Sequence, residues 1–203
     1  APAGKQFILQ PSGSSWTASI KPGELKGLPY LTLVCVANQD NLFNAAGTAF
    51  AALTAVVTDG NGAITTPGTT LDAFKAAYTA KMTGADILKT PLAMTGTGTV
   101  KISGSVSKVA ITLKRIVARF DIDNTTATSQ LTIENVSMGQ GRPNGSLFGA
   151  TLTNIPNPAE SLDLLKYADV AFAGENANQG TLESALYVYP NLATDQSYLI
   201  VKG

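Results

Sequence analysis

The sequence predicts a mainly β protein with a few short helices, and three observations support this prediction. Nineteen glycines divide the 203 residues into short segments, many of them rich in Thr, Val and Ala. Residues 30–38, YLTLVCVAN, form a continuous apolar run, and residues 110–124, AITLKRIVARFDIDN, alternate between apolar and polar side chains. Short apolar runs and a period of two are both typical of strands. The length suits one large domain or two small ones.

At the N-terminus the pattern predicts a hairpin followed by a buried strand. KQFILQ (5–10) and WTASIK (16–21) form the two arms, and PSGSS (11–15) forms the turn. The strand at 30–38 is apolar throughout, so we expect burial on both of its faces. Cys35 lies in this strand and is interpreted as a small buried hydrophobe, because a lone cysteine makes neither a disulfide framework nor a thiolate zinc site.

Two helices are predicted next. The first begins at Asp40 or Asn41 and ends at DGNG (59–62), because its apolar residues recur at helical spacing. The second is short and is capped by Thr70. The expected inner faces consist of Phe43, Ala46, Phe50, Leu53 and Val57 in the first helix, and of Leu71, Phe74 and Tyr78 in the second.

From Pro91 onward the pattern is that of strands. Residues 99–113 alternate around Gly104, and the parity of the apolar residues changes after Arg115. A slip of one residue turns every side chain to the other face, so the sequence predicts either a β-bulge at 114–115 or a strand that crosses between two sheets. Arg119, Asp121 and Asp123 then point to solvent. The residues expected to face a core are Val109, Ile111, Leu113, Ile116, Ala118, Phe120 and Ile122.

A polar segment, NTTATSQ (124–130), is the best candidate for a domain boundary. It divides the chain into an N-terminal domain of residues 1–124 and a C-terminal domain of residues 125–203. Because the chain stops on the last residues of a strand, we expect the second domain to be incomplete. Its expected elements are strands at 131–138, 147–152, 184–191 and 197–203, a turn-rich loop GQGRPNGS (139–146) and a short helix at 159–168.

Composition argues against several classes of function. The formal net charge is zero, with 14 basic and 14 acidic residues, which disfavours nucleic acid and an electrostatic hold on membranes. The absence of histidine excludes Ser-His-Asp and Cys-His catalysis and His-ligated zinc. We predict no enzyme, no cofactor and no metal. The remaining catalytic alternative is a secreted hydrolase with two carboxylates, although no pair is singled out. No signal peptide or membrane span is evident, which does not imply a cytoplasmic protein.

Two groups of residues have a functional interpretation beside an ordinary one. DGNG (59–62) and DIDN (121–124) bring oxygen ligands together as calcium loops do, but neither continues as such a loop, so turn chemistry is expected. Aromatic side chains stack on sugars when exposed and fill cores when buried. The candidates for a surface that binds sugars are Trp16, Tyr30, Tyr187 and Tyr189.

Five segments, taken in order, resemble the fimbrillins, the subunits of type V fimbriae of gut and oral anaerobic bacteria. AITLKRIVARFDIDN (110–124) is similar to the strand with an Arg-x-x-Ala-Arg centre that ends the family's first domain. NGSLFGATLTN (144–154) is similar to a Leu-Phe-Gly-Ala-Thr-Leu run in the second domain. The other three segments are LTLVCVAN (31–38), PLAMTG (91–96) and ALYVYPN (185–191).

The resemblance implies two transthyretin-like β-sandwich domains in a lipoprotein precursor that is anchored at the outer membrane and exposed on the cell surface. An arginine-specific protease removes the leading strand, and a strand from a neighbouring subunit fills the groove that is left. The core-facing residues from Val109 to Ile122 become candidates for this groove. Two departures are that no arginine precedes Arg115, and that the family's final strands are expected to be missing after Gly203.

The expected function is therefore a structural or accessory subunit of a fimbria (a pilus involved in cell adhesion). Its expected partners are other fimbrial subunits and, at the surface, host proteins or glycans. No nucleic acid is expected, and the membrane is contacted only through the lipid anchor of the precursor. The alternative is a surface adhesin or glycan-binding lipoprotein on the same fold, placed at the tip or at the anchor of the fibre.

Overall fold

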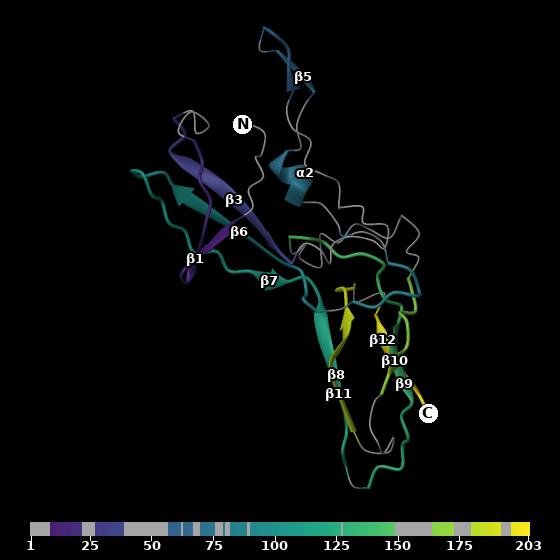
Figure 1. The fold of residues 1–203 in the computed structure, drawn as a ribbon. Coiled ribbons are helices and arrows are strands. Elements are labelled where there is room, and N and C mark those ends of the chain that lie inside the picture. Colours follow the sequence, from purple (N-terminus) through teal and green to yellow (C-terminus); the bar gives the residue numbers. More distant parts are fainter. Residues whose placement is uncertain are drawn as a thin grey trace. The chain divides into compact units, whose positions relative to one another are not determined.

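The computed structural model describes residues 9–21, 27–38, 57–61, 63–66, 70–75, 79, 82–88, 90–126, 128–148, 164–172, 180–191 and 196–203 (Figure 1). Described residues form mainly β structure in several sheets with antiparallel strand pairs. One short helix, α2 (Leu71–Lys75), occurs among them. The prediction of a mainly β chain is confirmed at this level.

The chain forms two compact units, each built from separated stretches of sequence. Unit 1 comprises Ala1–Cys35, Ala51–Lys75 and Gly96–Thr112. Unit 2 comprises Val36–Phe50, Ala76–Thr95 and Leu113–Gly203. This division differs from the boundary expected at 124–130, because the strand that precedes that segment pairs with a strand near the C-terminus.

Unit 1 is made largely of hairpins. Strands β1 (Gln10–Ser12) and β2 (Ser15–Thr17) pair around a turn in which Gly13 has a φ of 60°, so the predicted N-terminal hairpin is present with shorter arms. Glycine adopts this left-handed conformation without a steric penalty. A second hairpin joins β4 (Val57–Thr58) to β5 (Ile64–Thr66).

Strand β3 (Tyr30–Ala37) forms where it was predicted, but it is not buried on both faces. Tyr30 and Thr32 are exposed, and the other residues of the strand are at most half-buried. The strand ends at Asn38, which has a φ of 56° and donates a hydrogen bond from Nδ2 to the Leu92 carbonyl at 2.8 Å. Asparagine tolerates this conformation better than most residues, which explains the stop.

Helical predictions fare unevenly. The predicted first helix falls almost entirely on residues 39–56, which lie outside the described part, and Val57 belongs to strand β4 instead. The second begins as predicted, because the Phe74 amide donates to the Thr70 carbonyl at 2.9 Å. Tyr78 lies outside the described residues. In the predicted helix at 159–168, residues 164–168 are not helical, and Leu165 bridges to Gly141 instead.

Strand β6 (Met94–Lys101) pairs with β7 (Lys114–Arg115) in a sheet of order β3-β6-β7. The strand predicted over 99–113 ends at Lys101, and residues 102–113 carry no regular ladder. Even so, a Cβ placed on Gly98 would lie 2.9 Å from Ile111 Cγ1, so the returning chain runs close to β6. The side chains of Val109 and Ile111 occupy the space that a side chain at position 98 would fill.

The change of parity after Arg115 is explained by a strand that crosses between sheets. β7 pairs with β6, Ile116 and Val117 form a bend, and β8 (Ala118–Asn124) then pairs with β11 (Gly180–Val188) in a different sheet. Of the two alternatives that the sequence left open, the crossing is the one observed. The bend at Ile116 and Val117 accounts for the shift of one residue in the alternation of apolar side chains.

A three-stranded sheet completes unit 2. Strand β9 (Asn135–Gly139) lies between β10 (Val170–Ala171) and β12 (Tyr198–Lys202), and both pairings are antiparallel. Four of the five residues of β9 are buried, as expected for a central strand. Its flanking strands carry more exposed residues.

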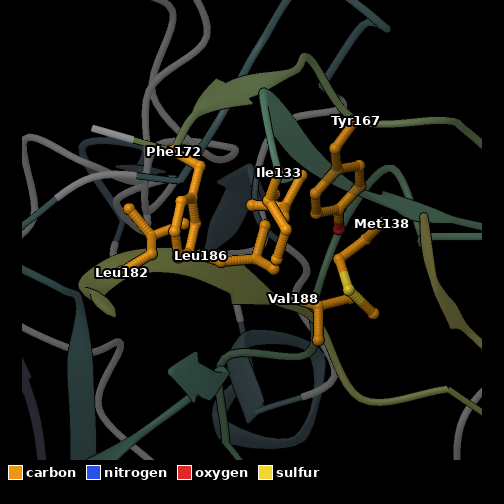
Figure 2. Packing of buried hydrophobic residues seen from close by; sticks show 8 residues of the cluster. Ile133, Met138, Tyr167, Phe172, Leu182, Leu186 and Val188 are labelled. Carbon is orange, nitrogen blue, oxygen red and sulfur yellow. The ribbon is translucent and has the colours of Figure 1, made fainter. Parts of the chain in front are cut away.

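Unit 2 contains a hydrophobic core to which strands β9 and β11 contribute most of the side chains. Figure 2 shows these side chains converging from several segments. Met138 and Tyr167 are each 1% exposed. The cluster consists of Ile133, Val136, Met138, Tyr167, Phe172, Leu182, Leu186 and Val188. A second cluster in the same unit consists of Ala93, Ile116, Leu147 and Tyr189.

The residues predicted to face a core are only partly buried. Ile116 is buried, Ile122 packs against the main cluster, and Val109 and Ile111 are half-buried. Leu113, Ala118 and Phe120 are exposed, which corrects the prediction for these positions. In β8 the predicted parity still holds, because Ala118, Phe120 and Ile122 pair with three residues of the main core cluster, and paired residues share a face. These partners are Val188, Leu186 and Leu182. The apolar face was therefore identified correctly, but part of it lacks cover among the described residues.

Candidate assembly surface

Strand β12 (Tyr198–Lys202) lies at the edge of the described three-stranded sheet and carries large apolar side chains that face solvent. It pairs on one side with β9, from Tyr198 opposite Gly139 to Lys202 opposite Asn135. Tyr198 is 53% exposed, Leu199 is 40% exposed and Val201 is 41% exposed. An edge strand presents unpaired backbone N–H and C=O groups that another strand can join. Among the described strands, β12 combines such an edge with the largest group of exposed apolar residues.

The single charge on this edge strand is held by an ion pair. Lys202 Nζ and Lys166 Nζ each lie 2.5 Å from a carboxylate oxygen of Asp169. Hydrogen bonds from the two lysines keep the pKa of the Asp169 carboxyl well below its usual range. Lysine on an edge strand normally discourages pairing with another chain. Here a carboxylate beside Lys202 offsets that charge, which leaves the edge less protected than its sequence indicates.

Three tyrosine rings lie directly over three glycines in and beside the loop that follows β9. A Cβ added to Gly139 would collide with the ring of Tyr198, one added to Gly141 with Tyr167, and one added to Gly145 with Tyr189. The glycines therefore provide clearance for rings that arrive from three other segments. The Tyr198 ring lies close to its cross-strand partner Gly139, and about half of the residue remains exposed.

Sequence reasoning missed these contacts, because GQGRPNGS (139–146) was interpreted as a turn-rich loop. Closely spaced glycines are the default signal for turns. The sequence does contain a signal that these glycines could make room for aromatic rings, because three glycines in seven residues precede a region with several tyrosines. Spacing alone does not identify which ring meets which glycine.

A β-bulge in strand β11 is fixed by polar residues of β8. The pairing register shifts between Leu182 and Leu186, and Ser184 has a φ of 54°. The Ser184 amide donates to Asp121 Oδ1 at 2.9 Å, and Arg119 Nη1 donates to Ser184 Oγ at 3.0 Å. Arg119 and Asp121 also form an ion pair at 2.7 Å. These two residues were interpreted as ordinary solvent-facing strand residues, but they hold the bulge in place.

The four aromatic candidates for sugar binding divide into two pairs. Trp16 is 67% exposed and Tyr30 is 56% exposed, as a binding surface requires. Tyr187 and Tyr189 are each 3% exposed, so they do not belong to the surface. Burial raises the pKa of Tyr189, and the Tyr187 hydroxyl donates to the Ser184 carbonyl at 2.9 Å. Tyr187 lies in β11, Tyr189 directly follows that strand, and the alternating pattern alone does not establish that both are buried.

Both acidic segments make turn contacts. Asp59 Oδ1 accepts hydrogen bonds from the amides of Asn61 and Ala63, each at 2.9 Å, and Asp123 Oδ1 accepts from Thr125 N at 3.0 Å. These bonds are the turn chemistry that was predicted. In the described residues, no group of three or more Cys, Asp or Glu side chains is arranged to hold a metal ion. Cys35 is half-buried, and burial raises the pKa of its thiol.

No protein-family model matches the chain, and no curated protein or solved structure matches it significantly. Within the described residues, no helix is both long and apolar enough to span a membrane. The arrangement of strands and exposed side chains is therefore the main physical guide to function.

Proposed function

We propose that this chain is a structural or accessory subunit of a cell-surface fimbria and that subunits assemble by strand addition. Proteolytic maturation of a lipoprotein precursor precedes assembly, and the mature protein lies outside the cell, attached to the outer membrane through the fibre. The protein is not an enzyme. In this proposal the antiparallel sheets belong to two transthyretin-like β-sandwich domains, as the resemblance to the fimbrillins implies.

The observation that carries the proposal is the edge strand β12, with Tyr198, Leu199 and Val201 exposed. An extended segment of a neighbouring subunit gains main-chain hydrogen bonds along such an edge, and its own apolar side chains cover the exposed ones. Burial of apolar surface stabilises the contact by about 25 cal/mol for each Å² removed from water. Because Lys202 is already paired with Asp169, its charge opposes this approach less than a free lysine would.

The test is filament formation by the full-length natural protein, with and without brief digestion by a trypsin-like protease. We expect filaments in negative-stain microscopy and heat-labile ladders on a gel after digestion. A Val201→Asp variant places a charge on the edge and should abolish both. The matched control is Ile64→Asp, because Ile64 is 64% exposed but lies in β5 of unit 1. Stable monomers under all conditions, or equal filaments from the two variants, would argue against assembly through β12.

A second candidate function is that of a surface adhesin or glycan-binding lipoprotein at the tip or anchor of the fibre. Exposure of Trp16 and Tyr30 favours it, since exposed aromatic rings stack on the apolar faces of sugars. A glycan array would show selective binding that is weakened in Trp16→Ala and Tyr30→Ala. Tyr187 and Tyr189 have no part in this alternative, because both are buried. An array without selective signals would remove this candidate.

A further inference from the structure

The loop from Gln140 to Gly145 is fixed through its backbone. Gly141 and Leu165 exchange two amide-to-carbonyl hydrogen bonds of 2.8 Å. The Met82 amide donates to the Pro143 carbonyl at 2.7 Å, and the Thr79 amide donates to the Gly145 carbonyl at 2.9 Å. Backbone groups of this loop are thus tied to two other segments of unit 2. The loop is a rigid support for any side chain that it carries.

Arg142, in the middle of this loop, is buried without a partner for part of its guanidinium. The residue is 5% exposed, and its Nη1 is inaccessible to water and has no hydrogen-bond partner. None of the ion pairs among the described residues involves it. A buried cation without a counter-charge is strongly unfavourable, and native proteins almost always pair such a group.

The groups nearest in the hydrogen-bond network do not neutralise this charge. The Tyr167 hydroxyl donates its proton to the Arg142 carbonyl at 2.6 Å, and a neutral hydroxyl carries no charge that could offset the guanidinium. Burial raises the pKa of Tyr167, which keeps its hydroxyl neutral at physiological pH. The carboxylates of Asp121 and Asp169 are already paired with other cations. Arg142 is therefore a positive charge without a compensating anion in the described part of unit 2.

From this arrangement we propose that Arg142 is the binding site for a carboxylate group supplied by a ligand. The planar guanidinium presents parallel N–H donors that match the two oxygens of a carboxylate. A monoanion neutralises one buried arginine completely, whereas a phosphate dianion would leave a net buried charge. The proposal does not depend on assembly through β12.

The test uses sodium acetate as the probe and thermal unfolding of the full chain as the readout. Sodium chloride at equal ionic strength and acetamide, which is neutral and of similar shape, are the reference solutes. A ligand that binds only the folded state at 100 times its Kd should raise the melting temperature by about 5–10 °C. We expect this rise in acetate but not in the two references. A wild-type protein without an acetate-specific rise would overturn the proposal.

Arg142→Met is the decisive variant, with Arg119→Met as its matched control on the exposed face of β8. Arg142→Met should lose the acetate response, and Arg119→Met should keep it. Without acetate, Arg142→Met should melt at least as high as the wild type, since it removes an unpaired buried charge and keeps the volume. If that variant does not fold, Arg142→Lys keeps the charge but loses the bidentate geometry, and its acetate response should be about tenfold weaker in Kd. Retention of the full response in either variant would contradict the assignment.

Two larger probes distinguish the sources of the carboxylate. N-acetylaspartate methylamide represents an acidic side chain of a polypeptide, and N-acetylneuraminate represents a sugar acid. Both are titrated against the wild type and against the Arg142 variants. An Arg142-dependent response to the first assigns the site to an acidic peptide segment, and a response to the second alone assigns it to a carboxylated glycan. A response to either that persists without Arg142 would overturn the proposal.

Discussion

The two units differ most in where their large apolar side chains lie. Among the described residues, Val100 is the single buried hydrophobic side chain of unit 1, while the two clusters around Tyr167 and Tyr189 belong to unit 2. Unit 1 instead has Trp16, Tyr30, Ile64 and Val106 well exposed. Unit 2 also exposes apolar residues, notably on β12, but among the described residues the hydrophobic clusters that stabilise the fold lie in unit 2. Substitutions of matched residues in the two units test this difference directly.

The largest difference is expected from the removal of an aromatic ring. Tyr167→Ala should lower the free energy of unfolding by about 3–5 kcal/mol, because the ring is 1% exposed and packs in the main core. Trp16→Ala removes a larger ring that is 67% exposed, and its cost should be within about 0.5 kcal/mol. Urea unfolding followed by far-UV circular dichroism measures both. Equal losses of unfolding free energy in the two variants would mean that the difference in burial between Tyr167 and Trp16 does not determine their contributions to stability.

Glycine substitutions should give the next largest contrast. A Cβ on Gly141 would lie 2.9 Å from Tyr167 Cδ1 and closer still to Cε1, so Gly141→Ala should cost about 1–3 kcal/mol through overpacking. Gly60 in unit 1 has no atom within 4 Å of such a Cβ and has no left-handed φ. Gly60→Ala should be neutral or should stabilise by about 0.4–1 kcal/mol, because it restricts the unfolded chain. A stabilising Gly141→Ala would show that the Tyr167 ring moves easily.

These contrasts also indicate how far sequence reasoning reaches. The mainly β character, strand β3, the N-terminal hairpin and the break after Arg115 were predicted, because each follows from local periodicity or turn residues. The parity of β8 was predicted as well, yet Phe120 is exposed on the apolar face. Burial of that face depends on side chains from segments distant in sequence, so a local pattern does not predict which of its residues are buried.

The candidate surfaces were harder to predict for the same reason. Tyr187 and Tyr189 are aromatic residues of the kind that form a sugar-binding surface, but both side chains are buried. Burial of Arg142 was not predicted from the sequence, because a lone arginine in a glycine-rich loop is usually exposed. Only the hydrogen bonds that fix its loop, and the burial that they cause, make it unusual. Such features depend on tertiary contacts, which the sequence pattern does not contain.

The smallest expected effect concerns the ion pairs that hold strand β12. Asp169→Asn removes the partner of Lys166 and Lys202. Because these charged groups are largely exposed, the loss of stability should be smaller than that in Tyr167→Ala or Gly141→Ala. The folded-state pKa of Asp169 is lowered, so its stabilising contribution is present above the unfolded value near 4 and is lost as the pH falls toward the folded value. Wild type and variant should therefore differ most in melting temperature at pH 7, and the difference should shrink progressively as the pH falls below about 4.

High salt offers an independent control on the same pair of proteins. At 1 M NaCl the screening length falls to about 3 Å, so the difference at pH 7 should shrink because salt screens the interaction between the charges. A difference that persists at low pH or in high salt would mean that Asp169 acts through packing and not through charge. The effect on assembly should exceed the effect on stability, since Asp169→Asn leaves Lys202 unpaired on the edge strand. Under the proposed function, this variant should melt almost as the wild type does but form fewer filaments, which separates the role of the charge in folding from its role at the edge.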